Sequence, residues 1–482
     1  MTNTYASCLT IGLMTLCTSV GCSSGPSSNS NSSTSDGLPD LIIASVIADV
    51  NADGQNDVIV SNGQSVDQDI SPRVYINEGN GSSFQLKANA IPAQYGREKA
   101  SAVDMKVEDM NGDGKQDLLM ITLAEDYQSS RVQLFLGQGD GTFRDYSNQI
   151  SNSRWPSEQT GLLCAQKVGA NNAGAFYLRV GDYDGDHHLD FALSFGGISS
   201  CGGVIYLNDG SGNFSQASIN IQEPAVHPET SLVAQGDSEK LFSTEILDGD
   251  LNGDGKIDFF APRMDSTQVS YINTSSSGSL SFQVVKSTFS YQSGDLGSGI
   301  LHGALLDMNR DGVLDLIGSQ AYRGPDYQTK VAVRAYFGAV HSGSGKGDGT
   351  FTLNNDLLSE VPQVHLVRKF LVGDVNGDGG DDLFILNEGI DLAPFPGEPS
   401  FLFLSNGLLS LSGKLINSTS THFTAEAANT HQGALGDLDG DGDLDLLMNN
   451  SHQSVVSAPR VARIWLNDGQ GHFSEHSPSF HR

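Results

Sequence analysis

Basic residues are scarce in this sequence: its 482 residues include 26 Lys and Arg against 57 Asp and Glu, which gives a formal net charge of -31. With so few positive charges the protein has little with which to form a basic surface, so we expect it to bind no nucleic acid and no anionic membrane surface. Long apolar runs are also missing after the N-terminal stretch, so no later segment is expected to span a membrane. Metal cations are the expected counter-charges.

Common enzyme signatures are missing too. The sequence has no GxSxG, HExxH, P-loop or dinucleotide-binding motif, and no spacing of Cys and His that is typical of a zinc site. These absences disfavour a standard hydrolase and a nucleotide-dependent enzyme.

The N-terminus predicts export and a lipid anchor. Residues 1–21 carry no charged side chain and an apolar run too short to cross a bilayer, which is typical of a signal peptide. The tetrapeptide that ends at Cys22 resembles the bacterial lipoprotein box, so we expect Cys22 to be lipidated; a plain signal peptide cleaved nearby is the alternative. Residues 22–37 are rich in Ser and Asn, which predicts a flexible tether. We therefore expect a secreted, outer-membrane or cell-surface lipoprotein that meets the membrane only through this anchor.

Cysteine is rare, with five in the chain. Cys8 and Cys17 would leave with the signal peptide, so Cys164 and Cys201 are the two that remain beyond the anchor. An oxidising compartment would permit a disulfide bond between them. Two separate free thiols are the alternative.

An acidic motif, by contrast, recurs along the chain. The nine-residue pattern D-x-[ND]-x-D-[GH]-x-x-D occurs seven times, and successive copies start 57 to 73 residues apart. The copies are DVNADGQND from Asp49, DMNGDGKQD from Asp109, DYDGDHHLD from Asp182, DLNGDGKID from Asp250, DMNRDGVLD from Asp307, DVNGDGGDD from Asp374 and DLDGDGDLD from Asp437.

Short predicted strands flank every copy of the motif. Apolar or alternating stretches such as LIIASVIA precede it and stretches such as LFIL follow it, and most repeats then carry a second pair around a Gly-rich turn, as in RVYINEGNGSSF. Four short strands per repeat without helical periodicity are what a radial packing of sheets requires. We therefore predict an all-β fold, a seven-bladed β-propeller of four-stranded blades, over residues 38–482.

The motif itself predicts calcium-binding loops. Calcium takes six to eight hard oxygen ligands, and positions one, three, five and nine of the motif offer side-chain oxygens while position seven offers a carbonyl. Glycine at position six permits the sharp turn, although the third copy has His187 there. The cofactor expected is Ca²⁺, up to seven ions. The predicted ligands are Asp49, Asn51, Asp53, Asp57, Asp109, Asn111, Asp113, Asp117, Asp182, Asp184, Asp186, Asp190, Asp250, Asn252, Asp254, Asp258, Asp307, Asn309, Asp311, Asp315, Asp374, Asn376, Asp378, Asp382, Asp437, Asp439, Asp441 and Asp445.

Two alternatives to such loops are an EF-hand and a turn without metal. An EF-hand needs a bidentate Glu at position twelve, and no copy has one. The residues at that position are Val60, Met120, Leu193, Ala261, Gly318, Ile385 and Met448. A plain Asp-Gly turn without metal would explain one copy, but seven copies with carboxylates at alternate positions favour a bound cation.

With these motifs the repeats resemble the FG-GAP or VCBS repeats of bacterial surface proteins and of the integrin α-subunit head. The resemblance covers about residues 37 to 482. It implies a propeller with calcium in the loop that joins the two inner strands of each blade. It implies no single activity, because the family includes adhesins, lectin-like binders and some polysaccharide lyases.

A polar ring is predicted at the channel. Five residues before each motif lie Ala44, Asp104, Tyr177, Glu245, His302, Lys369 and Gln432, which we expect near the channel mouth, and the residues one position later are mostly apolar and expected between blades. The candidate catalytic residues are Tyr177, Glu245, His302, Lys369 and, one position away in the last blade, His431.

Two functions follow from these features. The first is a calcium-binding cell-surface module that binds a glycan or a surface protein without catalysis. The alternative is a polysaccharide lyase or related carbohydrate-active enzyme, in which the ring would remove a proton beside a carboxylate and stabilise the resulting charge.

Overall fold

A computed structural model describes residues 38–39, 42–61, 71–92, 100–124, 130–151, 154–155, 174–196, 203–217, 220–222, 245–262, 267–289, 299–320, 329–340, 346–390, 396–405, 414–424, 427–450 and 462–481. The expected signal peptide, the lipidation site Cys22, the tether and the pair Cys164 and Cys201 lie outside these ranges.

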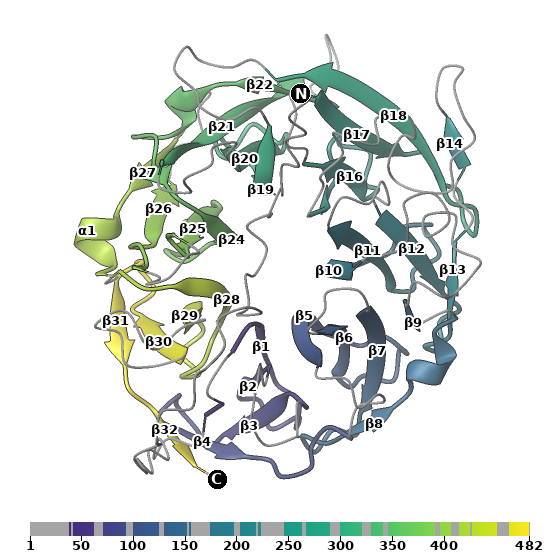
Figure 1. Ribbon diagram of the computed structural model, residues 1–482, viewed down its shortest axis with the longest axis vertical. Helices are drawn as coiled ribbons and strands as arrows, with labels where there is room; N and C mark the ends of the chain where they lie inside the picture. The colour runs from purple at the N-terminus through teal and green to yellow at the C-terminus, as the bar shows by residue number, and fades with distance from the viewer. Residues whose placement is uncertain are drawn as a thin grey trace, which may run out of the picture.

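The chain forms a ring of seven sheets around a central axis (Figure 1), and each sheet is built on four antiparallel strands that follow one another in the sequence, to which four of the sheets add a short fifth strand. This confirms the predicted seven-bladed propeller. Blade 1 is β1 (Ser45–Ala48), β2 (Asp57–Val60), β3 (Arg73–Asn77) and β4 (Ser83–Leu86); blade 2 is β5 (Ala100–Glu108), β6 (Asp117–Ala124), β7 (Ser130–Gly137) and β8 (Phe143–Asp145); blade 3 is β10 (Gly174–Gly181), β11 (Asp190–Gly196), β12 (Gly203–Asn208) and β13 (Phe214–Gln216); blade 4 is β15 (Leu247–Gly249), β16 (Asp258–Ala261), β17 (Thr267–Asn273) and β18 (Ser281–Thr288).

The remaining blades follow the same order. Blade 5 is β19 (Ile300–Leu306), β20 (Asp315–Gln320), β21 (Val331–Val340) and β22 (Gly347–Leu353); blade 6 is β24 (Val367–Gly373), β25 (Asp382–Asn387), β26 (Phe401–Ser405) and β27 (Leu415–Asn417); blade 7 is β28 (Thr430–Gly436), β29 (Asp445–Asn450), β30 (Ala462–Asn467) and β31 (Phe473–His476). The additional short elements are β9 (Arg154–Trp155), β14 (Asn220–Gln222), β23 (Gln363–Val364), β32 (Ser479–His481), α1 (Thr419–His422) and two 3-10 turns at Ser147–Gln149 and Asn355–Leu357.

The apolar runs of the sequence form the second strand of each blade. In β2, β20, β25 and β29 every residue is buried, because neighbouring blades cover both faces of the sheet. A strand covered on both sides reads as a continuous apolar run instead of an alternating one. The short runs VIV and LFIL after the acidic motifs therefore predict these strands well.

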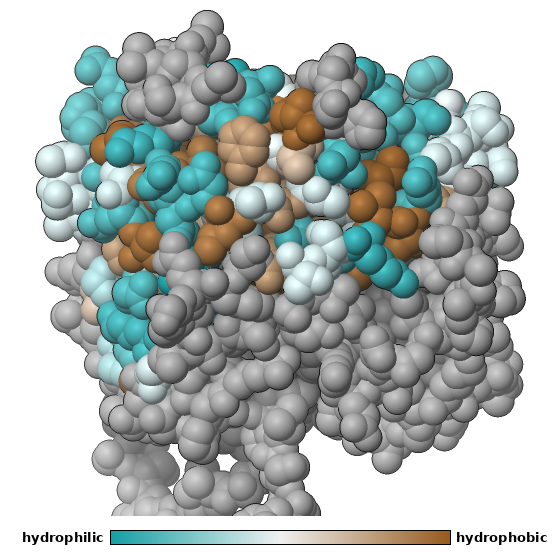
Figure 2. Space-filling model, turned by 90° about the horizontal axis from the view of Figure 1, so that it is seen from above, coloured by the Kyte–Doolittle hydropathy of each residue, from teal (hydrophilic) through white to brown (hydrophobic). Residues whose placement is uncertain are grey.

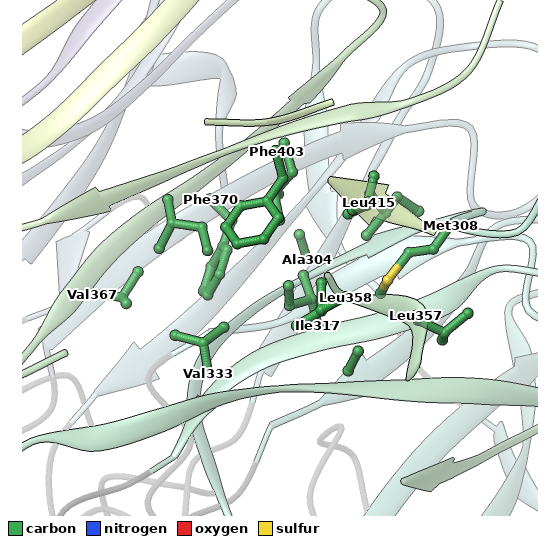
Figure 3. Packing of buried hydrophobic residues seen from close by; sticks show 14 of the residues in the cluster. Ala304, Met308, Ile317, Val333, Leu357, Leu358, Val367, Phe370, Phe403 and Leu415 are labelled. Carbon is green, nitrogen blue, oxygen red and sulfur yellow. The ribbon is translucent and has the colours of Figure 1, made fainter. Parts of the chain in front are cut away.

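Apolar packing between consecutive blades holds the ring together. Each of the seven buried clusters draws its residues from two neighbouring blades. Figure 3 shows the cluster between blades 5 and 6, where Ile317 and Val333 pack against Phe370 and Phe403. The residues four positions before the acidic motifs take part, since Met105, Leu178, Ile246 and Phe370 are buried in such clusters, as predicted.

Five of the innermost strands carry an irregularity at the same point. The pairing register shifts between residues 102 and 104, 175 and 177, 300 and 302, 367 and 369, and 430 and 432. Each shift leaves one extra residue on the innermost strand, which is a β-bulge. The bulges place the predicted ring residues, which directly follow them.

The ring closes without an exchange of strands between the first and last blades. Instead, the C-terminal strand β32 pairs in parallel with the outermost strand β4 of blade 1. Other junctions use the same device, because β14 runs parallel to β18 and isolated parallel bridges join Ile150 to Phe214 and Phe423 to Phe473. The segment that leaves one blade thus extends the outer edge of the next blade.

The side of the outer rim that Figure 2 shows has no large apolar patch among the described residues. The rim at the top of Figure 1, where β18 and β22 lie, shows hydrophobic residues in small groups separated by hydrophilic ones (Figure 2). Val340, which is 43% exposed, is the one large hydrophobic residue found exposed in the described part of the chain. No helix in the described ranges is long and apolar enough to cross a membrane.

Closure through β32 predicts a stability effect at Phe480. Its ring is buried, stacks on Phe84 at 5.1 Å between ring centroids and meets the edge of Tyr75 at 5.2 Å. Phe480→Ala is expected to lower the free energy of unfolding by about 3 to 5 kcal/mol, because it leaves a cavity in the core between blades 7 and 1. Chemical denaturation measures this, and Ser479→Ala on the exposed face of the same strand is the control. An unchanged unfolding midpoint for Phe480→Ala would show that the tail does not close the ring.

Candidate functional site

The seven acidic motifs form the loops that join the first and second strands of the blades. We number these loops 1 to 7 after their blades. Because every blade has the same strand order, all seven loops lie on one face of the disc. Each motif begins at the residue directly after the first strand, and its ninth residue is the first residue of the second strand.

Loop 2 shows the geometry that the copies share. Asp109 accepts hydrogen bonds from the backbone N–H groups of Asp113 at 3.0 Å and Gly114 at 2.8 Å. The side chain at position three also accepts from the fifth N–H, and the fifth carboxylate accepts from the seventh N–H. The side-chain oxygens at positions one, three and five are therefore held at the centre of the turn by the loop's own backbone.

Two positions in each loop have a left-handed backbone. At position six φ is between 73° and 97°, and His187 adopts the same conformation as the glycines with φ 73°. The His187 N–H still donates to Asp182 at 2.9 Å, so loop 3 keeps the shared geometry despite the missing glycine. Position four is left-handed as well, including in the two loops that lack glycine there, where Ala52 has φ 60° and Arg310 has φ 58°. Sequence reasoning missed this second position, although glycine stands there in five copies.

The ninth-position aspartates are buried and serve as backbone acceptors. Asp117 accepts from the N–H of Met110 at 3.0 Å and from the N–H of Gly137 at 2.8 Å, and the other six copies make the same pair of bonds. One bond holds the loop and the other holds the end of the third strand. This carboxylate therefore fixes the loop to its blade.

Burial raises the pKa of every ninth-position carboxyl. The pKa rises to about 6 in Asp57, Asp117, Asp382 and Asp445 and to about 7 in Asp190, Asp258 and Asp315. The two backbone hydrogen bonds lower the pKa and the other loop carboxylates raise it further, but burial is the largest cause. A nearby cation would offset this cost.

The oxygen atoms of the loops suit a hard cation. In loop 3 one oxygen each from Asp182, Asp184 and Asp190 lies within 4.8 Å of the others, and in loop 7 those of Asp437, Asp439 and Asp441 do so. Oxygen-only donor sets of this kind match calcium, which binds carboxylate and carbonyl oxygens at 2.3 to 2.6 Å. The remaining loops have Asn at position three and so offer an amide oxygen there.

The same loops also connect neighbouring blades. Asn77 at the end of β3 donates its side-chain N–H to the Leu438 carbonyl of loop 7 at 2.8 Å. Asn208, Asn273 and Asn467 make the equivalent bond to the preceding loops at 2.7 to 2.8 Å. Anything that orders a loop therefore also supports the next blade.

The predicted channel ring brings Tyr177, Glu245 and His302 together from three consecutive blades. The Tyr177 hydroxyl lies 3.2 Å from His302 Nδ1, and that nitrogen lies 3.5 Å from Glu245 Oε2. Arg179 binds Glu245 at 2.8 Å and Asp248 at 3.1 Å. Burial would raise the pKa of Glu245, but the hydrogen bond with His302 and the charge of Arg179 lower it to about 2. Burial, followed by Glu245, raises the pKa of Tyr177.

Three ring residues accept backbone hydrogen bonds from the next blade. Asp104 accepts from the N–H of Leu178 at 2.8 Å, and Glu245 accepts from the N–H of Gly303 at 3.3 Å. Gln432 of the last blade accepts from the N–H of Ser45 of the first at 3.0 Å. The ring is therefore more buried than expected for a channel mouth, with Asp104, Glu245 and His302 exposed by 4% or less.

The other predicted ring members differ. Ala44 is buried in the core between blades 1 and 2. Lys369 is half-buried on β24, and burial together with the charge of Lys106 lowers its pKa to about 8. His431 is the bulged residue of β28; burial and Arg368 lower its pKa to about 4, and its Nδ1 has no hydrogen-bond partner among the described residues.

Solved structures with a similar chain path are remote. BBS1N in complex with ARL6DN is 10% identical, covers 88% of this chain and 95% of its own and has a TM-score of 0.42. A COPII chain from the outer coat vertex on membranes is 7% identical, with 91% and 99% covered and a TM-score of 0.41. Penicillium chrysogenum alpha-L-arabinanase complexed with arabinobiose is 10% identical, with 73% and 90% covered and a TM-score of 0.40. At these values none indicates what this chain binds.

Comparison of the sequence itself gives a family. No curated protein is significantly similar to this chain. The model of the FG-GAP-like repeat matches residues 49–120, 109–193, 250–318 and 374–448, which together are more than half of the chain. Each match begins at the first Asp of an acidic loop and ends in the second strand of a blade. The chain therefore belongs to the family of FG-GAP-like repeat proteins.

Proposed function

We propose that this protein is a calcium-binding propeller that binds a glycan or a protein ligand at the cell surface and catalyses no reaction. The calcium part rests on the seven loops, which share one backbone conformation and turn carboxylate and amide oxygens to a common centre. Each loop also holds a buried carboxyl with a raised pKa. A divalent cation bound in a loop would compensate the charges of that loop.

The hydrogen bonds that the ring residues make favour a binding module. The carboxylates of Asp104 and Glu245 accept backbone N–H groups from the next blade, and Arg179 also binds Glu245. A general base needs a free lone pair beside its substrate. Side chains that join buried blades are poorly placed for that role, so the ring supports a rigid scaffold more than a reaction centre.

A lyase is the second candidate, and one arrangement favours it. Tyr177 and His302 are in hydrogen-bond contact, and Lys369, whose pKa is lowered to about 8, faces the same charges from blade 6. A Tyr, His or Lys that removes a proton and a cation that stabilises a carboxylate are the groups that such a reaction needs. This candidate requires the substrate to enter the channel.

Attachment at the surface rests on the sequence of the N-terminus. The signal peptide, the lipidated Cys22 and the tether of residues 22–37 would place the disc outside the cell, where calcium is at millimolar concentration. Loops of extracellular modules often have dissociation constants of about 0.1 to 1 mM, which suits that concentration.

Removal of calcium is expected to lower the melting temperature. A cation that binds the folded loops and not the unfolded chain stabilises the fold by mass action. Differential scanning calorimetry with EDTA and with excess calcium measures the shift, and native mass spectrometry counts the bound ions. Asp254→Asn in loop 4 should lose one ion, whereas Asp356→Asn at an exposed site outside the loops should lose none. Equal melting in EDTA and calcium would contradict the assignment.

Without metal, stability is expected to fall as the pH rises from about 5.5 to 7.5. The ninth-position carboxyls have folded pKa values of about 6 to about 7, above the ordinary aspartate value of 3.8, so the folded state binds more protons in this window. Their contribution is present at low pH and is lost as the pH passes the folded pKa. His422 and His431, whose pKa values are lowered, act in the opposite direction but are two groups against seven. Melting curves in EDTA test this, and a rise in melting temperature over the same window would contradict it.

A glycan screen separates the two functions. Purified protein is tested against a panel of neutral and acidic polysaccharides, both for binding and for the ultraviolet absorbance of new unsaturated ends. Binding without new absorbance is expected. If cleavage is seen, the double variant His302→Ala, Lys369→Ala should abolish it, and cleavage that survives in this variant would exclude the ring as the catalytic site.

A further inference from the structure

Loop 5 differs from all other loops at its fourth position. That residue is Arg310, whereas loop 1 has Ala52 and the remaining loops have glycine. Arg310 keeps the left-handed backbone of the position, with φ 58°, which a side chain other than glycine adopts at a cost. A long basic side chain at such a position calls for a compensating contact.

The contact is made with the acidic loop of the next blade. The Arg310 guanidinium forms an ion pair with Asp378, donates to the Asp378 carbonyl at 3.3 Å and donates to Ser405 Oγ at 3.1 Å. Asp378 is the fifth residue of loop 6 and is one of its predicted metal ligands. Ser405 Oγ also lies 3.1 and 3.2 Å from the two Asp378 oxygens. Both oxygens of this carboxylate therefore already have polar partners.

Loop 6 has the residues that admit this guanidinium. Its seventh residue is Gly380, where a Cβ atom would lie 1.8 Å from an Arg310 nitrogen. The other loops have Gln55, Lys115, His188, Lys256, Val313 and Asp443 at that position. Ser405 stands where four other blades have the Asn that bonds to the preceding loop, so Arg310 makes the connection between blades 5 and 6 instead.

Burial distinguishes this ion pair between loops from the Lys115–Asp113 pair inside loop 2. Arg310 and Asp378 have 14% and 26% of their side chains exposed. In loop 2, Lys115 lies 3.5 Å from Asp113 with 43% and 38% exposed, so water and salt screen that pair. A guanidinium keeps its charge at any physiological pH and stays in place when it is shielded from solvent.

We propose that Arg310 is the built-in counter-cation of loop 6, so that this loop keeps its shape without calcium and binds no calcium ion at concentrations that fill the other loops. The guanidinium neutralises the Asp378 carboxylate, which a calcium ion in loop 6 would need as a ligand. A divalent cation that entered loop 6 would be repelled by Arg310 unless it displaced this side chain. The inference rests on the proposed binding of calcium by the remaining loops.

Native mass spectrometry across a calcium titration tests the inference. The wild-type protein should hold one ion fewer than it has acidic loops. Arg310→Gly, which installs the residue that most loops have at this position, should gain one ion. Asp378→Asn should leave the wild-type count unchanged, whereas Asp254→Asn at the equivalent position of loop 4 should reduce it by one.

Controls separate the possible failures. Arg310→Lys keeps a positive charge and should gain no ion or a weakly held one, and melting in calcium confirms that each variant is folded. A wild-type count equal to the number of loops, or a loss of one ion in Asp378→Asn, would overturn the role of Arg310 while leaving calcium binding intact. A wild-type protein with no bound calcium would overturn both proposals.

Discussion

Burial of a carboxylate at the start of every second strand is the constraint on which this propeller depends. The ninth aspartate of each loop ties the loop to the end of the third strand through two backbone hydrogen bonds, as Asp117 does with Met110 and Gly137. Burying a charge costs free energy unless it is paired. The raised pKa of these seven carboxyls expresses that cost, and the oxygens around each loop indicate where a cation would offset it.

The contact between each loop and the next blade is made by different residues at different junctions. Asn77, Asn208, Asn273 and Asn467 bond to the preceding loop, but three blades lack this Asn. Between blades 1 and 2 the Gly141 N–H donates to the Val50 carbonyl at 3.1 Å instead. Between blades 4 and 5 Lys346 donates to Gly253 at 2.6 Å, and between blades 5 and 6 Arg310 takes the place. Different side chains thus meet one requirement, which is that each loop must contact the next blade.

The repeat pattern predicts the fold well because its two main signals are local. Acidic turns with glycine and short apolar runs specify a loop and a strand regardless of what surrounds them, and seven copies at similar spacing specify the ring. The ring residues were harder to predict, because bulges decide how the innermost strands present Tyr177 and His302, and a bulge leaves no clear mark in the sequence. The pairing of Arg310 with Asp378 joins residues of different repeats, so no periodic pattern could indicate it.

Charged side chains are arranged differently in the loops and in the channel. The loops collect much of the acidic excess on one face of the disc. In the channel, acids and bases occur together, since Glu245 forms an ion pair with Arg179 and lies beside His302. Burial, followed by the charge of Lys106, lowers the pKa of Lys369, while the carboxylates of Asp104 and Glu245 act in the opposite direction. The channel groups therefore already have neighbouring charges of opposite sign, whereas the carboxylates of each acidic loop lie close to one another.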